Sequence, residues 1–519
     1  MTTYRRPNTP TGGDLKMVRS KKMIAVAATG ALVLAACGGS DDEGSETTDA
    51  VEADAEAEEE APEEEAMEEE AMEEEAMEEE DHNDDEAMEE EAMEEEAMEE
   101  EAMEEEAMEE EPSGSAFVAD TSGCEDPDAA TSVIEDSISI GTSIPLSGGP
   151  AVLFAPFADG QQAYIDYYNS EFGGVNGQEL ELVVKDDQYT ADLTVANIEE
   201  LVFDDEVDVI AGVIGSPNNL AIQEELNALC IPQLTASTGA ANWGDVDNLP
   251  WTTGLLVPYA IESQVWAAQA AADGATTAGL FYVNNEFGQS YADAFEVAAE
   301  ANGIEIIVSE TIEATDSGAP SGQVTNLVAA NPDTVLAVPL GAQCIAFMTE
   351  IGNAKAANAD FGASIYQTAT CANPIFFGAV ANGGADGVFT SNNLKDISNE
   401  EVATTDEGVI AYLEAFAATG SEADPSGIAA AGWESMEVAV HAIQEAADAG
   451  DLTRVSIIEA ARNVNYSSQL LLDGLTYSMS AEDGYLAEGT QLRIWSDAEG
   501  GFVAQGDAVD FNGSLGIVS

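Results

Sequence analysis

The 519-residue chain is poor in basic residues, with 12 Lys and Arg against 103 Asp and Glu, and it has only two His. Half of the cations lie in residues 1–37, so residues 116–519 hold six cations and 60 acids. A surface of this charge repels phosphate backbones and anionic lipids, which excludes nucleic acid as a partner. We interpret the charge as a solvated acidic surface of the kind found in salt-adapted proteins.

The scarcity of histidine argues against an enzyme. His82 lies in an acidic low-complexity stretch, and His441 lies within a predicted helix among apolar residues, where it is expected to be structural. The chain has no Cys/His cluster with metal-ligand spacing, no G-x-S-x-G elbow and no Walker or G-x-G-x-x-G loop. A serine hydrolase would also lack its base. We therefore expect no enzymatic activity, no catalytic residue, no metal and no cofactor.

An apolar run long enough to span a bilayer is missing from the N-terminal region. The run at residues 24–36 has 13 residues, whereas a spanning helix needs ~20. Because Arg19, Lys21 and Lys22 precede it, residues 1–36 are predicted to be a secretory signal peptide. Met17 is an alternative start, since residues 17–23 supply a basic segment by themselves.

Cysteine is scarce too, and the first of the five has a distinctive context. Small residues precede Cys37 and Gly38-Gly39-Ser40 follows it, which resembles the lipobox of bacterial lipoproteins. The resemblance implies that Cys37 is lipidated and anchors the mature protein to the extracytoplasmic face of the cell membrane. The alternative is an ordinary signal peptide with an incidental cysteine.

Residues 38–115 contain 42 acids and no Lys or Arg, and much of the segment repeats E-E-E-A-M. A five-residue period advances about 500° around a helix, so the methionines form no packing stripe. Each i,i+4 pair gives repulsion or no interaction in place of a salt bridge. We predict that residues 37–115 form a disordered acidic tether. A coiled coil and a cation-binding tail are the alternatives.

Residues 116–519 alternate between strand-like and helix-like segments, an order typical of parallel sheets covered by helices. Two such series follow each other along the chain. Strands are predicted at 138–144, 179–184, 207–214, 231–234, 278–283, 304–308, 334–338 and 364–367. Helices are predicted around 163–168 and at 191–203, 220–228, 261–272, 291–301, 323–330, 345–356, 409–418, 426–447 and 455–462.

Two predicted strand ends are rich in hydrogen-bond donors. Ser216 is placed as the N-cap of a helix with Pro217 as its first residue, and Ser237 and Thr238 end the next strand. Hydroxyls and free N–H groups at helix starts suit a carboxylate ligand. The alternative is that these residues only cap their helices.

Four segments of the folded part are distinctive: I-G-T-S-I-P-L-S-G-G at 140–149, E-F-G-G-V-N-G-Q-E-L-E-L-V-V-K-D-D at 171–187, I-A-G-V-I-G-S at 210–216 and N-N-E-F-G-Q-S-Y at 284–291. Together they resemble the leucine/isoleucine/valine-type binding proteins of ABC importers, which are type I periplasmic binding proteins. The resemblance covers about residues 130–515. It implies an α/β fold of two doubly wound lobes joined by a three-crossover hinge.

The resemblance places lobe 1 at about 130–252 and 390–465, and lobe 2 at about 253–389 and 466–519, within a solute-binding domain spanning 116–519. It implies a monomer that captures an amino acid or a related small carboxylate or amide and delivers it to ABC permease subunits. A sensory receptor of the same fold is one alternative. An acidic cell-surface protein that binds divalent cations or other partners is another.

Ligand contacts follow by motif. Ser216 matches the family's serine contact to the ligand carboxylate, Ser237 and Thr238 fall in the segment that holds the polar head, and Phe287 and Phe154 match aromatic walls. The family's acid for the ligand ammonium has no counterpart in residues 366–371. Because an unpaired ammonium is costly in a closed cleft, either Glu286 substitutes or the ligand is another carboxylate, an amide or an aromatic acid.

Four cysteines remain besides Cys37, and four cysteines permit three pairings. Cys344 opens a helix of the second lobe and Cys371 follows the next strand, so these two are expected to form a disulfide. That pairing leaves Cys124 with Cys230. The alternative is that two of the four are free buried thiols.

Overall fold

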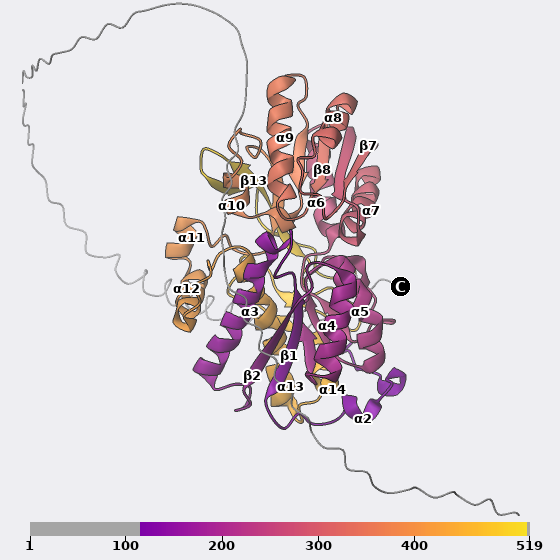
Figure 1. The fold of residues 1–519 in the computed structure, drawn as a ribbon, viewed down its shortest axis with the longest axis vertical. Helices are drawn as coiled ribbons and strands as arrows, with labels where there is room; N and C mark the ends of the chain where they lie inside the picture. The colour runs from indigo at the N-terminus through magenta and orange to yellow at the C-terminus, as the bar shows by residue number, and fades with distance from the viewer. Residues whose placement is uncertain (1–114, 516–519) are drawn as a thin grey trace, which may run out of the picture. The chain divides into compact units, whose positions relative to one another are not determined.

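The computed structural model describes residues 115–515. The expected signal peptide (1–36), the lipidation site Cys37 and the E-E-E-A-M repeat lie outside the described residues. The described part forms two α/β lobes, which Figure 1 shows one above the other. None of the helices in residues 115–515 combines the length and the apolar character needed to cross a bilayer.

The first lobe is built on a parallel sheet of five strands in the order β2-β1-β3-β4-β5. Its strands are β1 (Ile138–Ile144), β2 (Leu180–Asp186), β3 (Val209–Ala211), β4 (Gln233–Ala236) and β5 (Thr252–Gly254). The interior strands β3 and β4 are buried throughout. Near-continuous apolar strands of this kind fit a parallel sheet that helices cover on both faces.

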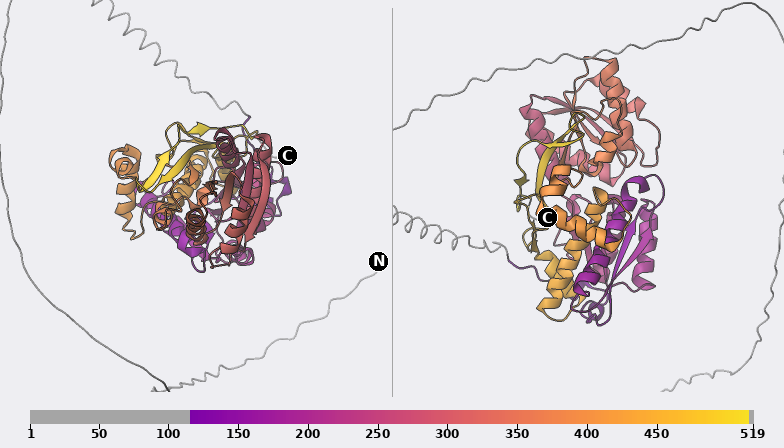
Figure 2. Two further views of the ribbon diagram at one scale, coloured as in Figure 1. Left: turned by 90° about the horizontal axis from the view of Figure 1, so that it is seen from above. Right: turned by 90° about the vertical axis from the view of Figure 1, so that its left-hand side faces the viewer.

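Helices cover both faces of this sheet, and one face takes helices from the far end of the sequence (Figures 1 and 2). The first-lobe helices are α3 (Ala151–Phe172), α4 (Ala191–Phe203), α5 (Ser216–Leu229), α11 (Glu400–Thr405), α12 (Glu407–Thr419), α13 (Ile428–Ala449) and α14 (Arg454–Arg462). Helices α4 and α5 enclose one core with Ile198, Leu226 and the sheet. Helices α3 and α13 enclose the other, with Tyr164 against Trp433. The late predicted helices therefore complete the first lobe.

The second lobe is built on a larger, mixed sheet in the order β14-β13-β10-β9-β8-β6-β7, with β15 also paired to β13. Its strands are β6 (Thr277–Val283), β7 (Glu305–Ile312), β8 (Thr334–Val338), β9 (Ser364–Gln367), β10 (Phe389–Asn392), β13 (Gly489–Ser496), β14 (Gly501–Ala504) and β15 (Val509–Asp510). The pairs from β7 to β10 are parallel, and β13 runs antiparallel to β10. The C-terminal strands thus return to the second lobe.

The helices of the second lobe pack on this sheet around a core that includes Trp266, Phe281 and Phe347. They are α6 (Tyr259–Ala272), α7 (Glu286–Ala301), α8 (Ser321–Ala330), α9 (Gln343–Ala357) and α10 (Pro374–Gly378). Helix α7 starts where it does because the Asn285 side chain accepts a hydrogen bond from the backbone N–H of Gly288. Shorter elements are η1 (Thr121–Gly123), α2 (Pro127–Ala130), η2 (Ala241–Gly244) and η3 (Ala369–Cys371).

Three chain segments connect the lobes and pack against one another. The first follows β5, the second follows β10, and the third runs from α14 to β13 through the small hairpin of β11 (Asn465–Tyr466) and β12 (Tyr477–Ser478). Leu255 of the first segment shares a core with Leu394 and Leu471 of the other two. Leu394 and Leu471 also form a bridge between the second and third segments. This is the three-crossover arrangement expected from the sequence.

Three local predictions need correction. The strand predicted at 207–214 is shorter, because Gly212 and Gly215 adopt φ of +66° and +99° and turn the chain after Ala211. Ser216 is the first residue of α5 and not its N-cap, which is Gly215. The structure also has five strands after residue 464, β11 to β15, where no strand was predicted.

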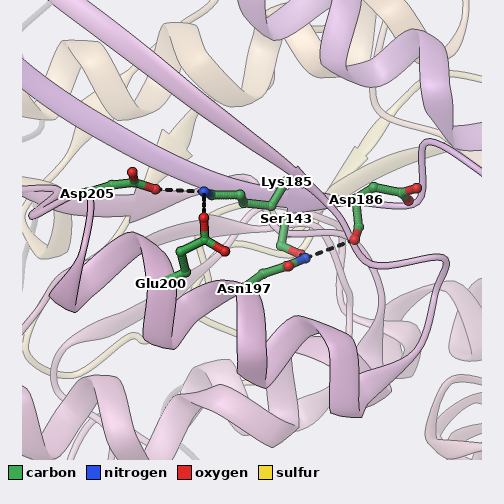
Figure 3. Close-up of polar contacts among 6 residues, drawn as sticks. All are labelled: Ser143, Lys185, Asp186, Asn197, Glu200 and Asp205. Atoms are coloured by element: carbon green, nitrogen blue, oxygen red, sulfur yellow. Dashed lines mark hydrogen bonds and ion pairs between the residues drawn. The ribbon is translucent and has the colours of Figure 1, made fainter. Parts of the chain in front are cut away.

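A polar network ties α4 to the edge of the first sheet (Figure 3). Lys185 Nζ of β2 lies 2.6 Å from Glu200 Oε1 and 2.8 Å from Asp205 Oδ2. Asn197 of α4 donates to Ser143 Oγ at 3.0 Å and to the Asp186 carbonyl at 3.1 Å. These contacts hold the carboxyl ends of β1 and β2 in place.

Each lobe contains one disulfide. Cys124 pairs with Cys230 in the first lobe, and Cys344 pairs with Cys371 in the second. This is the pairing expected from the sequence. Because neither bridge joins the two lobes, the disulfides constrain each lobe without fixing the lobes to each other.

Candidate ligand-binding site

A cavity lies between the two lobes, at the carboxyl ends of the strands of the first sheet. Both lobes and the crossover segments line it. Its volume is about 170 Å³. Since a cavity that holds one water needs at least ~10–15 Å³, this cavity has room for a small organic molecule of roughly a dozen non-hydrogen atoms.

Aromatic rings form much of the cavity wall. On the first-lobe side, Phe154 of α3 stacks on Tyr189 with ring centroids 5.7 Å apart. On the second-lobe side, Tyr259 stacks on Tyr291, and Phe287 meets both rings edge-on. Such a lining favours a ligand that is largely apolar.

The position of Tyr189 depends on a buried carboxylate. Asp187 accepts hydrogen bonds from the Tyr189 backbone N–H at 2.8 Å and from Ser143 Oγ at 2.8 Å. Tyr189 itself has a φ of +59°, a strained conformation for a residue with a side chain. Gly215 is required opposite it, because a Cβ there would lie 2.7 Å from the Tyr189 ring. Burial raises the pKa of Asp187, although these hydrogen bonds act against the rise.

Two buried hydroxyl groups, those of Ser216 and Thr238, lie beside the hydroxyl of Tyr259 near the start of α5. Ser216 and Thr238 are fully buried, and their hydroxyl oxygens lie 2.6 Å apart. The Tyr259 hydroxyl lies 3.5 Å from Ser216 Oγ and 3.3 Å from Thr238 Oγ1. Neither Ser216 nor Thr238 lines the cavity. The two hydroxyls expected to hold a ligand carboxylate therefore lie behind the Tyr259 ring in this structure.

Glu262, one turn after Tyr259 on α6, lines the cavity and is only 3% exposed. Its Oε2 accepts a hydrogen bond from the Tyr291 hydroxyl, and its Oε1 accepts one from Ser391 Oγ of β10. Thr368 donates in turn to the Tyr291 oxygen at 3.0 Å. Burial raises the pKa of Glu262 to about 7, against the lowering effect of the two hydroxyl donors.

Two further hydroxyls line the cavity without a hydrogen-bond partner. They are Ser237 Oγ, after β4 of the first lobe, and Thr490 Oγ1, on β13 of the second. Ser237 is 8% exposed and Thr490 is 1% exposed. A buried hydroxyl without a partner costs free energy, so both groups are available to a ligand that reaches them.

The structure brings together three of the five expected contact residues. Ser237, Phe287 and Phe154 line one cavity, whereas Ser216 and Thr238 lie behind it. Thr370 of the 366–371 segment lines the cavity and supplies no acid, as the sequence already indicates. Glu286, the expected substitute, is exposed at the start of α7 and does not line the cavity.

Sequence reasoning missed Tyr189, Tyr259, Glu262, Tyr291 and Thr490. Tyr291 ends the N-N-E-F-G-Q-S-Y segment, and Glu262 is the one charged residue of α6, so a signal existed for both. An acid alone in an apolar helix is a candidate for a buried role. Thr490 had no such signal, because its strand lies in the Gly- and Asp-rich end of the chain.

The cavity lining contains few ionisable side chains. Among the described residues that line it, Glu262 is the one charged side chain, and none is Lys, Arg or His. No group of three or more His, Cys, Asp or Glu in residues 115–515 has the geometry of a metal site. The lining is mostly apolar and contains a few polar groups.

Comparison with known proteins agrees with this geometry. The profile of the family described as "Periplasmic binding protein" matches residues 137–496. No curated protein matches the chain.

Several solved structures share the fold at low sequence identity. A fatty acid ABC transporter substrate-binding protein from Thermomonospora curvata is 19% identical, with a TM-score of 0.62, and the match covers 73% of this chain and 93% of that one. A solute-binding protein from Rhodopseudomonas palustris in complex with benzoate is 19% identical with a TM-score of 0.60, covering 72% and 98%. Another from that species, in complex with 3,4-dihydroxybenzoic acid, is 19% identical with a TM-score of 0.60, covering 73% and 100%.

Proposed function

Because the chain belongs to the periplasmic binding protein family, we propose that it is an extracytoplasmic solute-binding protein. Its two lobes close over a small organic molecule and deliver that molecule to the permease of an ABC transporter. It carries out no bond chemistry. The observation that carries the proposal is the aromatic-lined cavity of about 170 Å³ between the lobes.

The ligand class proposed from the sequence is an amino acid or a related small carboxylate or amide. The cavity volume supports a molecule of this size. Aromatic and fatty acids, the ligands named for the structural neighbours, extend the set worth testing. The one charged side chain of the lining is an acid, so the lining favours an amine or an uncharged group over a carboxylate.

A ligand panel tests the proposal. A molecule that binds only the folded protein raises its stability by ~2.7 kcal/mol at a concentration 100 times its Kd. We expect at least one member of a panel of amino acids, amines, amides and small acids to raise the melting temperature of residues 116–519. If no compound in a broad panel shifts the melting temperature, the transport proposal fails.

We also propose that Cys37 anchors the protein by a lipid, and that the acidic repeat lets the lobes reach outward from the membrane. Cys37→Ser should release the protein into the medium while leaving ligand binding intact. Cell fractionation with an antibody to the folded domain measures the release. A Cys37→Ser protein that stays in the membrane fraction would contradict the anchor.

A further inference from the structure

The cavity is lined by an acidic side chain, although the ligands named for the structural neighbours are organic acids. Its one charged side chain is Glu262, which is 3% exposed, and among the described residues that line the cavity none carries a positive charge. A buried carboxylate is stable only when a counter-charge or hydrogen-bond donors compensate it. The ligand is therefore the natural source of a positive charge.

The six Lys and Arg residues of the folded part do not line the cavity, and most of them have hydrogen-bond or ion-pair partners elsewhere. Arg462, fully buried, donates to the carbonyls of Leu249, Pro250 and Thr252. Arg493 donates to the Leu394 carbonyl at 2.7 Å. The others pair with surface acids, donate to backbone carbonyls or lie half-buried: Lys185, Lys395, Arg454 and Lys355.

The hydrogen bonds of Glu262 leave acceptor capacity unused. A carboxylate has about four acceptor sites on its two oxygens. Each oxygen of Glu262 receives one hydroxyl, from Tyr291 and Ser391. One site per oxygen thus remains for a donor in the cavity, which an ammonium group can fill.

The aromatic walls favour the same charge. Tyr259 and Tyr291 are stacked with centroids 3.8 Å apart, so the faces between them are closed to a ligand. The cavity meets the remaining surface of these two rings and the rings of Phe287 and Phe154. An aromatic face that is open to the cavity attracts a cation and repels an anion. A carboxylate would instead meet aromatic faces and a like charge.

We propose that the cavity binds a compact, mostly apolar molecule that carries a protonated amino group, with Glu262 as its counter-ion. Ser237 and Thr490, whose hydroxyls lack partners, supply hydrogen bonds to the ligand from the two lobes. A molecule whose one charge is a carboxylate is rejected. This inference rests on the proposed function as a solute-binding protein and narrows its ligand class.

The access of a carboxylate to the start of α5 is limited by Tyr259. Its hydroxyl lies within 3.5 Å of both Ser216 Oγ and Thr238 Oγ1. A ligand carboxylate can reach those two hydroxyls only if the Tyr259 ring moves. The amino group is therefore the part of the ligand on which recognition depends.

A matched set of four compounds tests the assignment by isothermal titration calorimetry. 2-Phenylethylamine carries only an amine, 3-phenylpropanoate only a carboxylate, 3-phenylpropanamide no charge, and phenylalanine both charges. We expect the two amine-bearing compounds to bind about 100-fold or more tightly than 3-phenylpropanoate, from the cost of an unpaired buried charge. Tighter binding of 3-phenylpropanoate than of 2-phenylethylamine would overturn the inference.

Variants locate the counter-ion. Glu262→Gln should weaken 2-phenylethylamine about 100-fold and leave 3-phenylpropanamide within about threefold. Glu296→Gln, an exposed change of equal charge on α7, is the control and should change neither affinity. Full loss of amine binding in Glu286→Gln, with Glu262→Gln unaffected, would place the counter-ion at Glu286 and overturn the assignment. Melting curves without ligand establish that each variant is folded.

The pH dependence gives a readout that a purely structural role of Glu262 would not move. The ligand-free pKa of Glu262 is about 7, whereas an alkyl ammonium ionises near ~10.4. Amine affinity should therefore rise about tenfold from pH 6 to pH 8 and be flat in Glu262→Gln. Two titratable groups lie near Glu262, Tyr259 and Tyr291, and burial raises the pKa of both. The nearby residues on β10 and β13 are Ser391 and Thr490, which do not titrate.

The outcomes separate this inference from the function it rests on. If acids or neutral compounds bind and amines do not, the protein is a solute-binding protein with a different ligand class. If nothing in the panel binds, the function itself fails. Amine binding that Glu262→Gln leaves unchanged would refute the role of Glu262 alone.

Discussion

Individual buried acids bring a stability cost that depends on pH. The folded protein raises the pKa of Glu262 from its ordinary 4.5 to about 7 through burial. It also raises the pKa values of Glu434 and Glu437, which lie on α13 and share Ser468 as a hydrogen-bond donor. A raised carboxyl pKa means that folding favours the protonated form, so these groups favour the folded state at low pH.

Glu262 provides a clean test of this effect. Its contribution to the free energy of unfolding is fully present below pH 4.5 and is lost as pH rises to about 7. The shift corresponds to about 3 kcal/mol. We therefore expect the free energy of unfolding of Glu262→Gln, minus that of the wild type, to increase by about 3 kcal/mol between pH 4.5 and pH 8. Urea unfolding of the ligand-free proteins at several pH values measures this difference.

Glu296→Gln is the matched control, because Glu296 is exposed on α7. Its unfolding free energy should follow the wild-type pH profile. If the profiles of Glu262→Gln and the wild type run parallel, Glu262 does not titrate differently in the folded and unfolded states.

At the scale of elements, the crossing of α3 and α13 positions part of the cavity. The two helices approach closely at Gly160 and Gly432, where a Cβ would meet the Ala429 carbonyl oxygen at 1.9 Å and the Phe157 carbonyl oxygen at 2.0 Å. Phe154 and Phe157 of α3, and Ile428 of α13, line the cavity. Separation of these helices would therefore affect both stability and binding.

Gly432→Ala tests this crossing. We expect a loss of about 3 kcal/mol in the free energy of unfolding, because the added methyl group meets backbone atoms that cannot move without separating the helices. Gly322→Ala on α8 is the control, because a Cβ there meets nothing within 4 Å. It should stabilise the protein by up to about 1 kcal/mol through helix propensity. Equal effects of the two variants in urea unfolding would contradict the close crossing.

Elements also show where local patterns are sufficient. The expected bounds of β1, α4, β8 and β9 agree with the structure, because each has a strong apolar pattern between clear turn signals. The strands β10 and β13 were missed. Each forms by pairing with a segment far away in the sequence, and a local window contains no information about that partner.

At the scale of the whole molecule, charge is the main feature. Residues 116–519 hold 60 acids and six cations, and two of those cations are largely buried arginines. The acids of the surface therefore repel one another with few compensating ion pairs. Salt shortens the range of this repulsion, from about 10 Å at 0.1 M to about 3 Å at 1 M.

The melting temperature of the folded domain should rise between low salt and 1 M NaCl, because screening stabilises the compact state. KCl at equal ionic strength should act like NaCl, since screening depends little on the identity of the monovalent ion. Differential scanning calorimetry measures the shift. A melting temperature that salt leaves unchanged would contradict the repulsion, and an extra rise with CaCl₂ at the same ionic strength would favour specific cation binding.

The sequence by itself determined the α/β class and the acidic, cation-poor character of the protein, because these depend on local periodicity and composition. The three-crossover hinge followed from the family resemblance, and the cysteine pairing from the expected positions of two strand ends. The family resemblance also pointed to Ser237, Phe287 and Phe154, and these three residues line the cavity. Only the tertiary structure decided that Tyr259 covers Ser216 and Thr238. It also decided that Glu262 is the acid of the cavity. The physical reason is that burial, hydrogen-bond partners and pKa are set by groups from several elements, which the chain brings together only when both lobes and their crossovers have packed.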